Sequence, residues 1–174
     1  MGSICTECGL CCDGTLFSWA STHPSDDLAA LIGAGALVVT DVSAERFKQP
    51  CPALEAQCCT IYDSRPTTCR EYRCKLLKRV EAGQTDKATA RDIIASVIDY
   101  RDRVRHLLEP LVGSPGPRAI LDLLERMERT GVAASLGREE RSSLMLNIAA
   151  LRLLIATHLD STNTVRNDQG PLGD

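Results

Sequence analysis

The sequence predicts an α+β fold: a small cysteine-organised lobe with short strands, followed by a predominantly α-helical bundle. The first observation behind this prediction is that all nine cysteines lie between Cys5 and Cys74 of the 174 residues. The second is that the chain beyond Cys74 carries apolar repeats with helical spacing. We therefore expect a cysteine-cluster region over residues 1–82, a helical region packed on it over 83–160, and a disordered polar tail over 161–174.

The cysteines have the spacing of metal ligands. Four of them stand within eight residues: Cys5, Cys8, Cys11 and Cys12. Gly9 supplies the backbone freedom that a tight metal-binding knuckle needs. The other five follow later: Cys51, Cys58, Cys59, Cys69 and Cys74. Nine is an odd number, and no signal-like apolar segment precedes the first cysteine, so metal coordination in a reducing cytoplasm is favoured over a disulfide framework.

Composition excludes several classes of function. A net charge of −3 and a pI near 5.6 leave no basic footprint for nucleic acid or anionic lipid, so neither is expected as a partner, whereas a protein partner stays open. The sequence contains no phosphate-binding glycine loop, dinucleotide fingerprint or nucleophile elbow, and we assign no catalytic residue. The three histidines are scattered, and His23, within the cysteine-bearing half, is the alternative to a thiol at one metal site.

Short elements are expected between the two groups of cysteines. Residues 13–19 form an apolar run suited to a strand, and residues 36–40 form a second one, rich in Leu and Val. Between these runs, Ser25 is expected to cap a short helix whose apolar face includes Leu31 and Ile32. The first half of the chain is thus predicted to contain both strands and helix.

The second group of cysteines predicts a hairpin and a helix. Two apolar arms, residues 51–54 and 58–62, are expected to pair around the intervening turn. Residues 67–80 are expected to form a helix that carries Cys69 and Cys74. At 3.6 residues per turn, these two thiols lie about 140° apart around a regular helix. Either the helix is distorted between them, or they serve different metal sites.

Three helices are expected in the rest of the chain, over residues 86–111, 117–129 and 138–159. The first has an apolar stripe: Ile93, Val97, Tyr100, Val104, Leu107 and Leu111. The second has four inward residues: Ile120, Leu121, Leu124 and Met127. The third is apolar nearly all round apart from Arg152, and we expect it to be the most buried. Its apolar part is shorter than the ~20 residues that span a bilayer, so membrane insertion is not expected.

The cysteine region resembles a known family. The pattern C-x-x-C-x-x-C-C, then C-P-x-L, then C-x-I-Y-x-x-R-P-x-x-C-R-x-Y-x-C, is similar to the cysteine-cluster (CxxCxxCC) family of zinc- or iron-chelating domains, also called YkgJ-like. The resemblance covers the first 74 residues and implies eight metal ligands: Cys5, Cys8, Cys11, Cys12, Cys51, Cys59, Cys69 and Cys74. It also implies that Arg65 and Arg70 donate hydrogen bonds near the bound metal. Cys58 lies outside the pattern, and a small buried hydrophobe is the alternative for it.

The residues leave the metal and the number of sites open. Successive side chains tend to diverge, so Cys11 and Cys12 suit two neighbouring four-thiol sites or one larger cluster. The run also resembles ferredoxin spacing, so zinc, iron and a 4Fe-4S cluster all fit the thiols. In every case we expect the eight cysteines to converge in space.

Two classes of function fit these expectations. The first is a small cytoplasmic protein that chelates zinc or iron through eight cysteines, with the metal folding the first half of the chain. The second is an iron–sulfur enzyme or redox protein, because the bacterial flagellin lysine N-methylases look similar in their cysteine region. This chain shows no S-adenosylmethionine site, so the first class is preferred.

Overall fold

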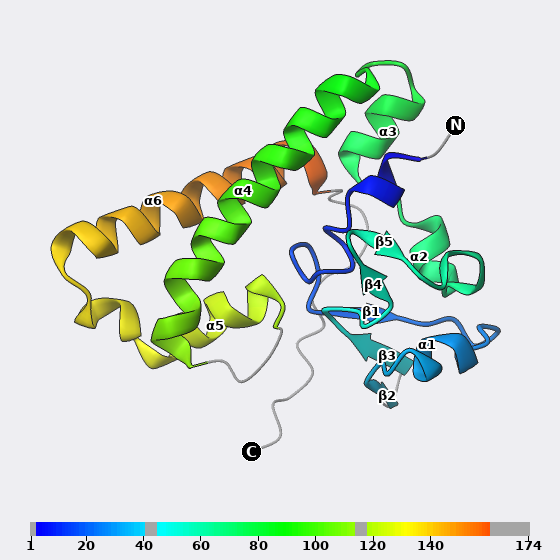
Figure 1. Cartoon of the computed structure of the whole chain (residues 1–174), viewed down its shortest axis with the longest axis horizontal. Coiled ribbons are helices and arrows are strands. Elements are labelled where there is room, and N and C mark those ends of the chain that lie inside the picture. The colour runs from blue at the N-terminus through cyan, green and yellow to red at the C-terminus, as the bar shows by residue number, and fades with distance from the viewer. Residues whose placement is uncertain (1–2, 41–44, 114–117, 161–174) are drawn as a thin grey trace.

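A computed structural model describes residues 3–40, 45–113 and 118–160. An N-terminal lobe of short elements lies beside a layer of long helices (Figure 1). The lobe contains η1 (Ile4–Glu7), β1 (Trp19–Ser21), α1 (Ala29–Gly33), β2 (Val38–Thr40), β3 (Glu45–Lys48), β4 (Leu54–Glu55), β5 (Cys58–Cys59), η2 (Tyr62–Ser64), α2 (Thr67–Glu71) and α3 (Lys75–Glu81). The helical layer contains α4 (Lys87–Val112), α5 (Ile120–Thr130), η3 (Val132–Ser135), α6 (Arg138–Leu154) and the π-helical turn η4 (Ile155–Leu159). The α+β prediction is confirmed. The predicted tail over 161–174 lies outside the described residues.

A three-stranded antiparallel sheet, in the order β1-β3-β2, anchors the lobe. The sequence prediction missed its central strand, β3, where Phe47 stands among charged residues and is 1% exposed. Ala20 and Val38 oppose Phe47 from the two flanking strands. The strand predicted over 36–40 is confirmed as β2.

The strand predicted over residues 13–19 is wrong for all but its last residue. The chain turns there instead: the Asp13 side chain accepts a hydrogen bond from the amide of Thr15 at 2.8 Å. The amide of Leu16 donates back to the carbonyl of Leu10 at 3.1 Å. These local bonds compete with strand pairing, so β1 begins only at Trp19.

The predicted Ser25 cap is also wrong. Helix α1 begins at Ala29, whose amide donates to the Asp27 carboxylate at 2.9 Å. The Ser25 hydroxyl contacts the His23 ring at 2.7 Å instead. Leu31 is buried as expected, but Ile32 is 56% exposed, because the five-residue helix buries only one side.

The predicted hairpin is present as β4 and β5. Leu54 opposes Cys59 and Glu55 opposes Cys58. The two turn residues, Ala56 and Gln57, have positive φ values of 44° and 69°, which is the backbone of the turns that join twisted hairpin strands. The turn packs against the first cysteine knuckle, since a Cβ added at Gly9 would lie 3.3 Å from Gln57.

The helix predicted over residues 67–80 is two helices. Helix α2 ends at Glu71, and Tyr72 is extended with φ −60° and ψ 131°. Helix α3 then begins at Lys75 with Cys74 as its N-cap. The Arg73 guanidinium satisfies carbonyls freed at this break, donating to that of Arg70 at 2.6 Å and that of Tyr72 at 3.1 Å. The first of the two alternatives, a distortion of the helix between Cys69 and Cys74, is therefore confirmed.

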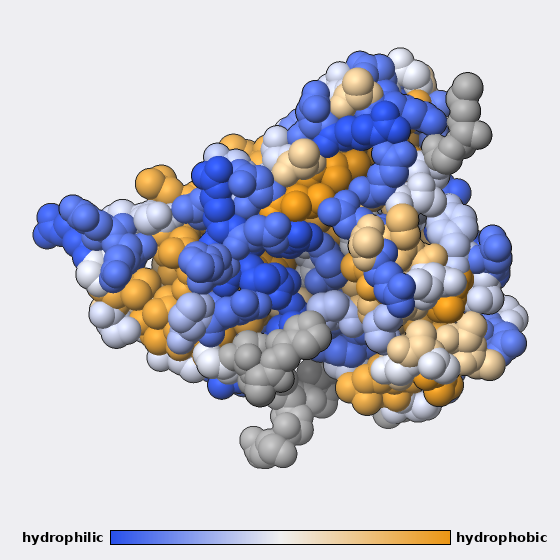
Figure 2. Space-filling model, viewed as in Figure 1, coloured by the Kyte–Doolittle hydropathy of each residue, from blue (hydrophilic) through white to orange (hydrophobic). Residues whose placement is uncertain are grey.

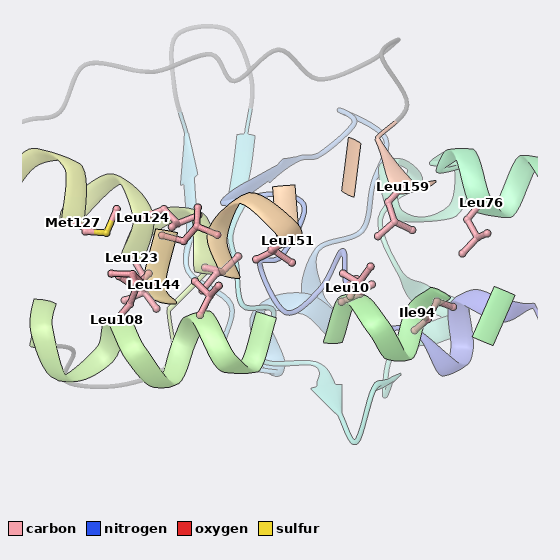
Figure 3. Packing of buried hydrophobic residues seen from close by; sticks show 14 of the residues in the cluster. Leu10, Leu76, Ile94, Leu108, Leu123, Leu124, Met127, Leu144, Leu151 and Leu159 are labelled. Carbon is pink, nitrogen blue, oxygen red and sulfur yellow. The ribbon is translucent and has the colours of Figure 1, made fainter. Parts of the chain in front are cut away.

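Helix α4 is the centre of the helical layer, packing against α3, α5 and α6. The Asp86 side chain caps it by accepting from the amide of Thr89 at 2.9 Å. Its buried residues are Ala90, Ile94, Val97, Val104, Leu108 and Val112. The predicted stripe shares Val97 and Val104 with this set, and its other members are half-buried beside it. Figure 3 shows Leu10 and Leu76 of the lobe joining the same core, which is continuous across the boundary predicted near residue 82. That boundary stays a prediction.

The expectation that the third long helix is the most buried is wrong. Helix α6 and its π-helical extension bury only Leu144, Ile148, Leu151 and Leu159. Leu146 is 70% exposed and Leu153 is 68% exposed, because α4 covers one side of the helix only. The span Arg138–Leu159 has the length and composition of a membrane-crossing helix, and 22% of its most apolar stretch is buried. The expected absence of membrane insertion stays a prediction.

Apolar surface also gathers on the lobe. Figure 2 shows it at the lower right, over the region of α1 and the three-stranded sheet, where Ile32 and Leu37 are exposed.

The lobe and the helical layer meet closely at Gly14. Its carbonyl accepts a hydrogen bond from the amide of Ile120, at the start of α5, at 3.2 Å. Its φ is +81°, and a Cβ added there would lie 2.5 Å from both the Cα and the Cβ of Ala119. Beside it, Asp13 forms an ion pair with Arg101 of α4. Only glycine allows this approach of the two backbones.

Candidate metal centre

Eight cysteines line one cavity of about 720 Å³ in the N-terminal lobe. They come from the first knuckle, from the segment of the β4–β5 hairpin, and from α2 and the start of α3: Cys5, Cys8, Cys11, Cys12, Cys51, Cys59, Cys69 and Cys74. Cys58 does not line the cavity. It is exposed, and its thiol donates to the carbonyl of Thr6 at 3.0 Å. These are the eight cysteines that the sequence pattern singled out, and their ligand role stays a prediction.

The charges that act on each thiol indicate two groups of four, which are joined where Cys12 raises the pKa of its neighbour Cys11. We call the first the knuckle group: Cys5, Cys8, Cys11 and Cys74. Burial, together with the smaller effects of the charges of Cys74 and Cys5, raises the pKa of Cys8 to about 12. Burial likewise raises the pKa of Cys11 and of Cys74. The break after α2 lets Cys74, which is distant in sequence, join the N-terminal thiols.

The other four form the hairpin group: Cys12, Cys51, Cys59 and Cys69. Burial raises the pKa of Cys12, and the charges of Cys69, Cys51 and Cys59 add to the effect. Burial also raises the pKa of Cys69 to about 12. Each group therefore draws thiols from both halves of the cysteine pattern.

Cys11 and Cys12 connect the two groups through a single peptide bond. The knuckle holds them in a turn in which the amide of Cys12 donates to the carbonyl of Gly9 at 2.9 Å. The carbonyl of Cys12 accepts a hydrogen bond from the amide of Cys51 at 2.7 Å, which connects the knuckle to another cysteine of the hairpin group. Cys11 is affected by Cys12 and then by the knuckle thiols, whereas Cys12 is affected by Cys69, Cys51 and Cys59, so the adjacent pair belongs to both groups.

A buried carboxylate fixes helix α2, which carries Cys69. The Asp26 side chain is 2% exposed and accepts from the amide of Thr67 at 3.0 Å. Burial disfavours its charge, but hydrogen bonds from the Thr67 side chain and from the amides of His23 and Thr67 outweigh this and lower its pKa. The long loop before α1 thereby holds the first turn of α2 in place.

Arg65 lies at the hairpin group. Its guanidinium carbon stands 3.8 Å from the centre of the Tyr62 ring, and its Nε is buried without a hydrogen-bond partner in the described structure. Its charge lowers the pKa of Cys69, against the larger effects of burial and of the neighbouring thiols. A metal-bound thiolate accepts hydrogen bonds from buried N–H donors of this kind.

The other residues predicted near the metal lie elsewhere. Arg70 is half-exposed, donates to the Thr67 hydroxyl at 2.9 Å and lies 3.9 Å from Asp26, so it braces α2 and does not line the cavity. His23 does not line it either. The prediction missed the aromatic wall, in which Phe17 and Tyr72 meet edge to face at 5.1 Å. Tyr72 belongs to the C-R-x-Y-x-C pattern, which was the available signal.

The chemistry of the thiols fits a metal centre, but their positions do not form one compact site for a single ion. Across residues 3–40, 45–113 and 118–160, no three Cys, His, Asp or Glu side chains are grouped closely enough to hold one metal ion. The thiols of each group repel one another when they are charged, and one group lies beside an N–H donor that has no hydrogen-bond partner among the described residues. Both features nevertheless fit a metal-bound state.

The cavity is lined by eight thiols, which are ligands of the type that zinc and iron prefer. The sequence profile of the CxxCxxCC family, a zinc- or iron-chelating domain, matches residues 4–92, just over half of the chain. The chain belongs to this family. No curated protein and no solved structure matches the chain significantly. The alternative of an enzyme related to lysine N-methylases therefore gains no support from these comparisons.

Proposed function

We propose that this cytoplasmic protein chelates zinc or iron through two four-cysteine sites, the knuckle group and the hairpin group. One observation carries the proposal: the eight cysteines of the family pattern line a single cavity in two coupled groups of four, while Cys58 lies outside it. The family description supports the same chemistry.

The protonation of the thiols depends on whether a metal cation is bound in the cavity. Burial and mutual repulsion raise the pKa values of Cys8, Cys12 and Cys69, so in a cavity without cations these thiols keep their protons. A metal cation reverses this balance: the thiols release their protons and bind it as thiolates. Because the ligands come from segments far apart in sequence, binding also closes long loops and stabilises the lobe.

Within this proposal, iron–sulfur clusters fit better than single zinc ions. Four thiolates on one zinc ion, with Zn–S near 2.3 Å, bring their sulfurs to about 3.8 Å from one another. The described side chains show no grouping of that compactness, although the cavity measures about 720 Å³. A cluster holds its thiolates on separate iron atoms, further apart, and supplies one-electron transfer.

Anaerobic purification followed by elemental and sulfide analysis tests the proposal. We expect two centres per chain: either iron with a matching amount of acid-labile sulfide and visible absorption, or two zinc ions and no colour. Colourless protein with two zinc ions would refute the cluster and retain chelation. Protein that holds no zinc or iron after anaerobic purification would refute the proposed function itself.

A further inference from the structure

We infer that the two sites are unequal: the hairpin group holds its metal more tightly than the knuckle group, and Arg65 is the residue that sets the difference. This inference rests on the proposed function, because it concerns the order in which two bound centres are lost. It is argued from side-chain contacts and exposure around the two groups.

Arg65 is built into the wall of the hairpin group. It follows η2 and precedes Pro66, which is buried, so its backbone is held in an extended conformation with φ −64° and ψ 149°. The Tyr62 ring covers one face of its guanidinium at 3.8 Å. The buried Nε then has no acceptor among the described residues, although a buried donor without a partner costs about 1–3 kcal/mol. A thiolate of Cys59 or Cys69 in the same cavity would supply the acceptor.

In the part of the chain that the structure describes, the knuckle group has no equivalent cation. Among the described residues that line the cavity, Arg73 is the other cationic one. Its Nε lies 3.3 Å from the Glu81 carboxylate and its NH1 donates to two backbone carbonyls. Lys75, the next cation along the chain, donates to the carbonyl of Ala156 at 2.8 Å. Arg73 therefore stabilises the break between α2 and α3, and Lys75 attaches α3 to the segment that contains Ala156.

Backbone donors do not distinguish the two groups. Burial is the largest influence on the pKa values of Cys8, Cys51 and Cys74, but backbone amides lower these values in both groups. In the knuckle group, Cys74 accepts from the amide of Leu77 at 3.4 Å. In the hairpin group, the amide of Ala53 acts in the same way on Cys51. The difference in metal retention between the two groups therefore comes from the Arg65 side chain.

The exposure of the cysteines also favours tighter metal binding by the hairpin group. Cys5 of the knuckle group is exposed and lies in the first turn of the described chain, whereas Cys51 of the hairpin group is buried. A chelator or an alkylating reagent reaches an exposed ligand first. The knuckle group should therefore lose its metal before the hairpin group.

The test is chelator challenge of the metal-loaded, full-length protein under anaerobic conditions. Released thiols are alkylated at successive times and located by mass spectrometry. In the wild-type protein we expect Cys5 and Cys8 to be alkylated in a fast phase, and Cys51 and Cys69 in a slower one. In Arg65→Met the slow phase should accelerate by about 10–100-fold, the usual loss when a residue that supports a ligand is removed.

Two further variants separate the effect of Arg65 from general destabilisation. Arg65→Lys keeps the positive charge without the planar donor, so it should restore part of the lag and remains informative if Arg65→Met does not fold. Arg103→Met is the matched control, because Arg103 also lies over a tyrosine, Tyr100 at 5.4 Å, but outside the cavity. It should leave both phases unchanged.

The outcomes are distinct. Simultaneous alkylation of both groups in the wild-type protein would overturn the inference while leaving metal chelation intact. An unchanged slow phase in both Arg65 variants would overturn the role of Arg65. Absence of metal from the wild-type protein would refute the proposed function and, with it, the inference.

Discussion

Replacing Gly14 by alanine should strongly destabilise the contact between the metal-binding lobe and the helices. Gly14 has φ +81°, a conformation that costs an alanine about 1–2 kcal/mol. Its new Cβ would stand 2.5 Å from the Cα and Cβ of Ala119, which is fully buried and cannot rotate away. Relieving this overlap should cost a further 1–3 kcal/mol, roughly, and would weaken the 3.2 Å hydrogen bond from Ile120 to the Gly14 carbonyl.

The expected loss is therefore about 2–5 kcal/mol in the free energy of unfolding, a large part of the roughly 5–15 kcal/mol of a typical domain. Denaturant unfolding measures it with two probes: the fluorescence of Trp19, the single tryptophan, reports the lobe, and far-UV circular dichroism reports the helices. Gly131→Ala is the control, since Gly131 has φ +64° but a Cβ there would meet nothing within 4 Å. It should cost only about 1 kcal/mol. If the two variants lost the same stability, the close approach at Ala119 would not be what requires glycine.

The remaining predictions concern metal and pH. Cys58→Ser should leave the metal content nearly intact, whereas Cys59→Ser should reduce it; equal losses in elemental analysis would mean that both thiols coordinate. Asp26→Asn should cost about 1.5–3 kcal/mol at neutral pH, because a buried carboxylate loses charge-assisted hydrogen bonds. The folded-state pKa of Asp26 is lowered, so its stabilisation is present above the unfolded pKa near 4, roughly, and disappears as the pH falls through the folded value. Denaturation midpoints between pH 7 and acid should therefore fall more steeply for wild type than for this variant, and parallel curves would contradict the assignment. Chelation or thiol alkylation should abolish the near-UV signal of Trp19 and the protease resistance of residues up to Leu77, with less effect on the helices; an unchanged lobe would show that the metal is not structural.

Local patterns were sufficient for several elements because their signals lie within a few residues. A long apolar repeat predicted α4 over residues 86–111, close to its observed bounds. The hairpin of β4 and β5 was predicted from two arms and a short turn. The cysteine pattern singled out the eight thiols that line the cavity, whereas the position of Cys58, which is exposed and not buried as one alternative had it, came from the structure.

Other elements depend on neighbours distant in the chain. Strand β3 has three charged residues around Phe47 and becomes a strand because β1 and β2 supply hydrogen bonds on both sides. Helix α6 is apolar enough for a core, yet Leu146 and Leu153 are exposed, since composition does not tell how many neighbours a helix receives. The apolar stripe of α4 is broader than the predicted one for the same reason.

The sequence by itself determined that this protein collects thiols for a metal: their number, their spacing and their family pattern are properties of the chain. Only the tertiary structure decided how they are divided. The break at Tyr72 turns Cys74 toward the N-terminal knuckle, and the Asp26 carboxylate holds α2 so that Cys69 faces the hairpin. Spacing along a chain constrains ligands that are close in sequence, whereas the pairing of distant ligands follows from backbone contacts that form only when the lobe packs.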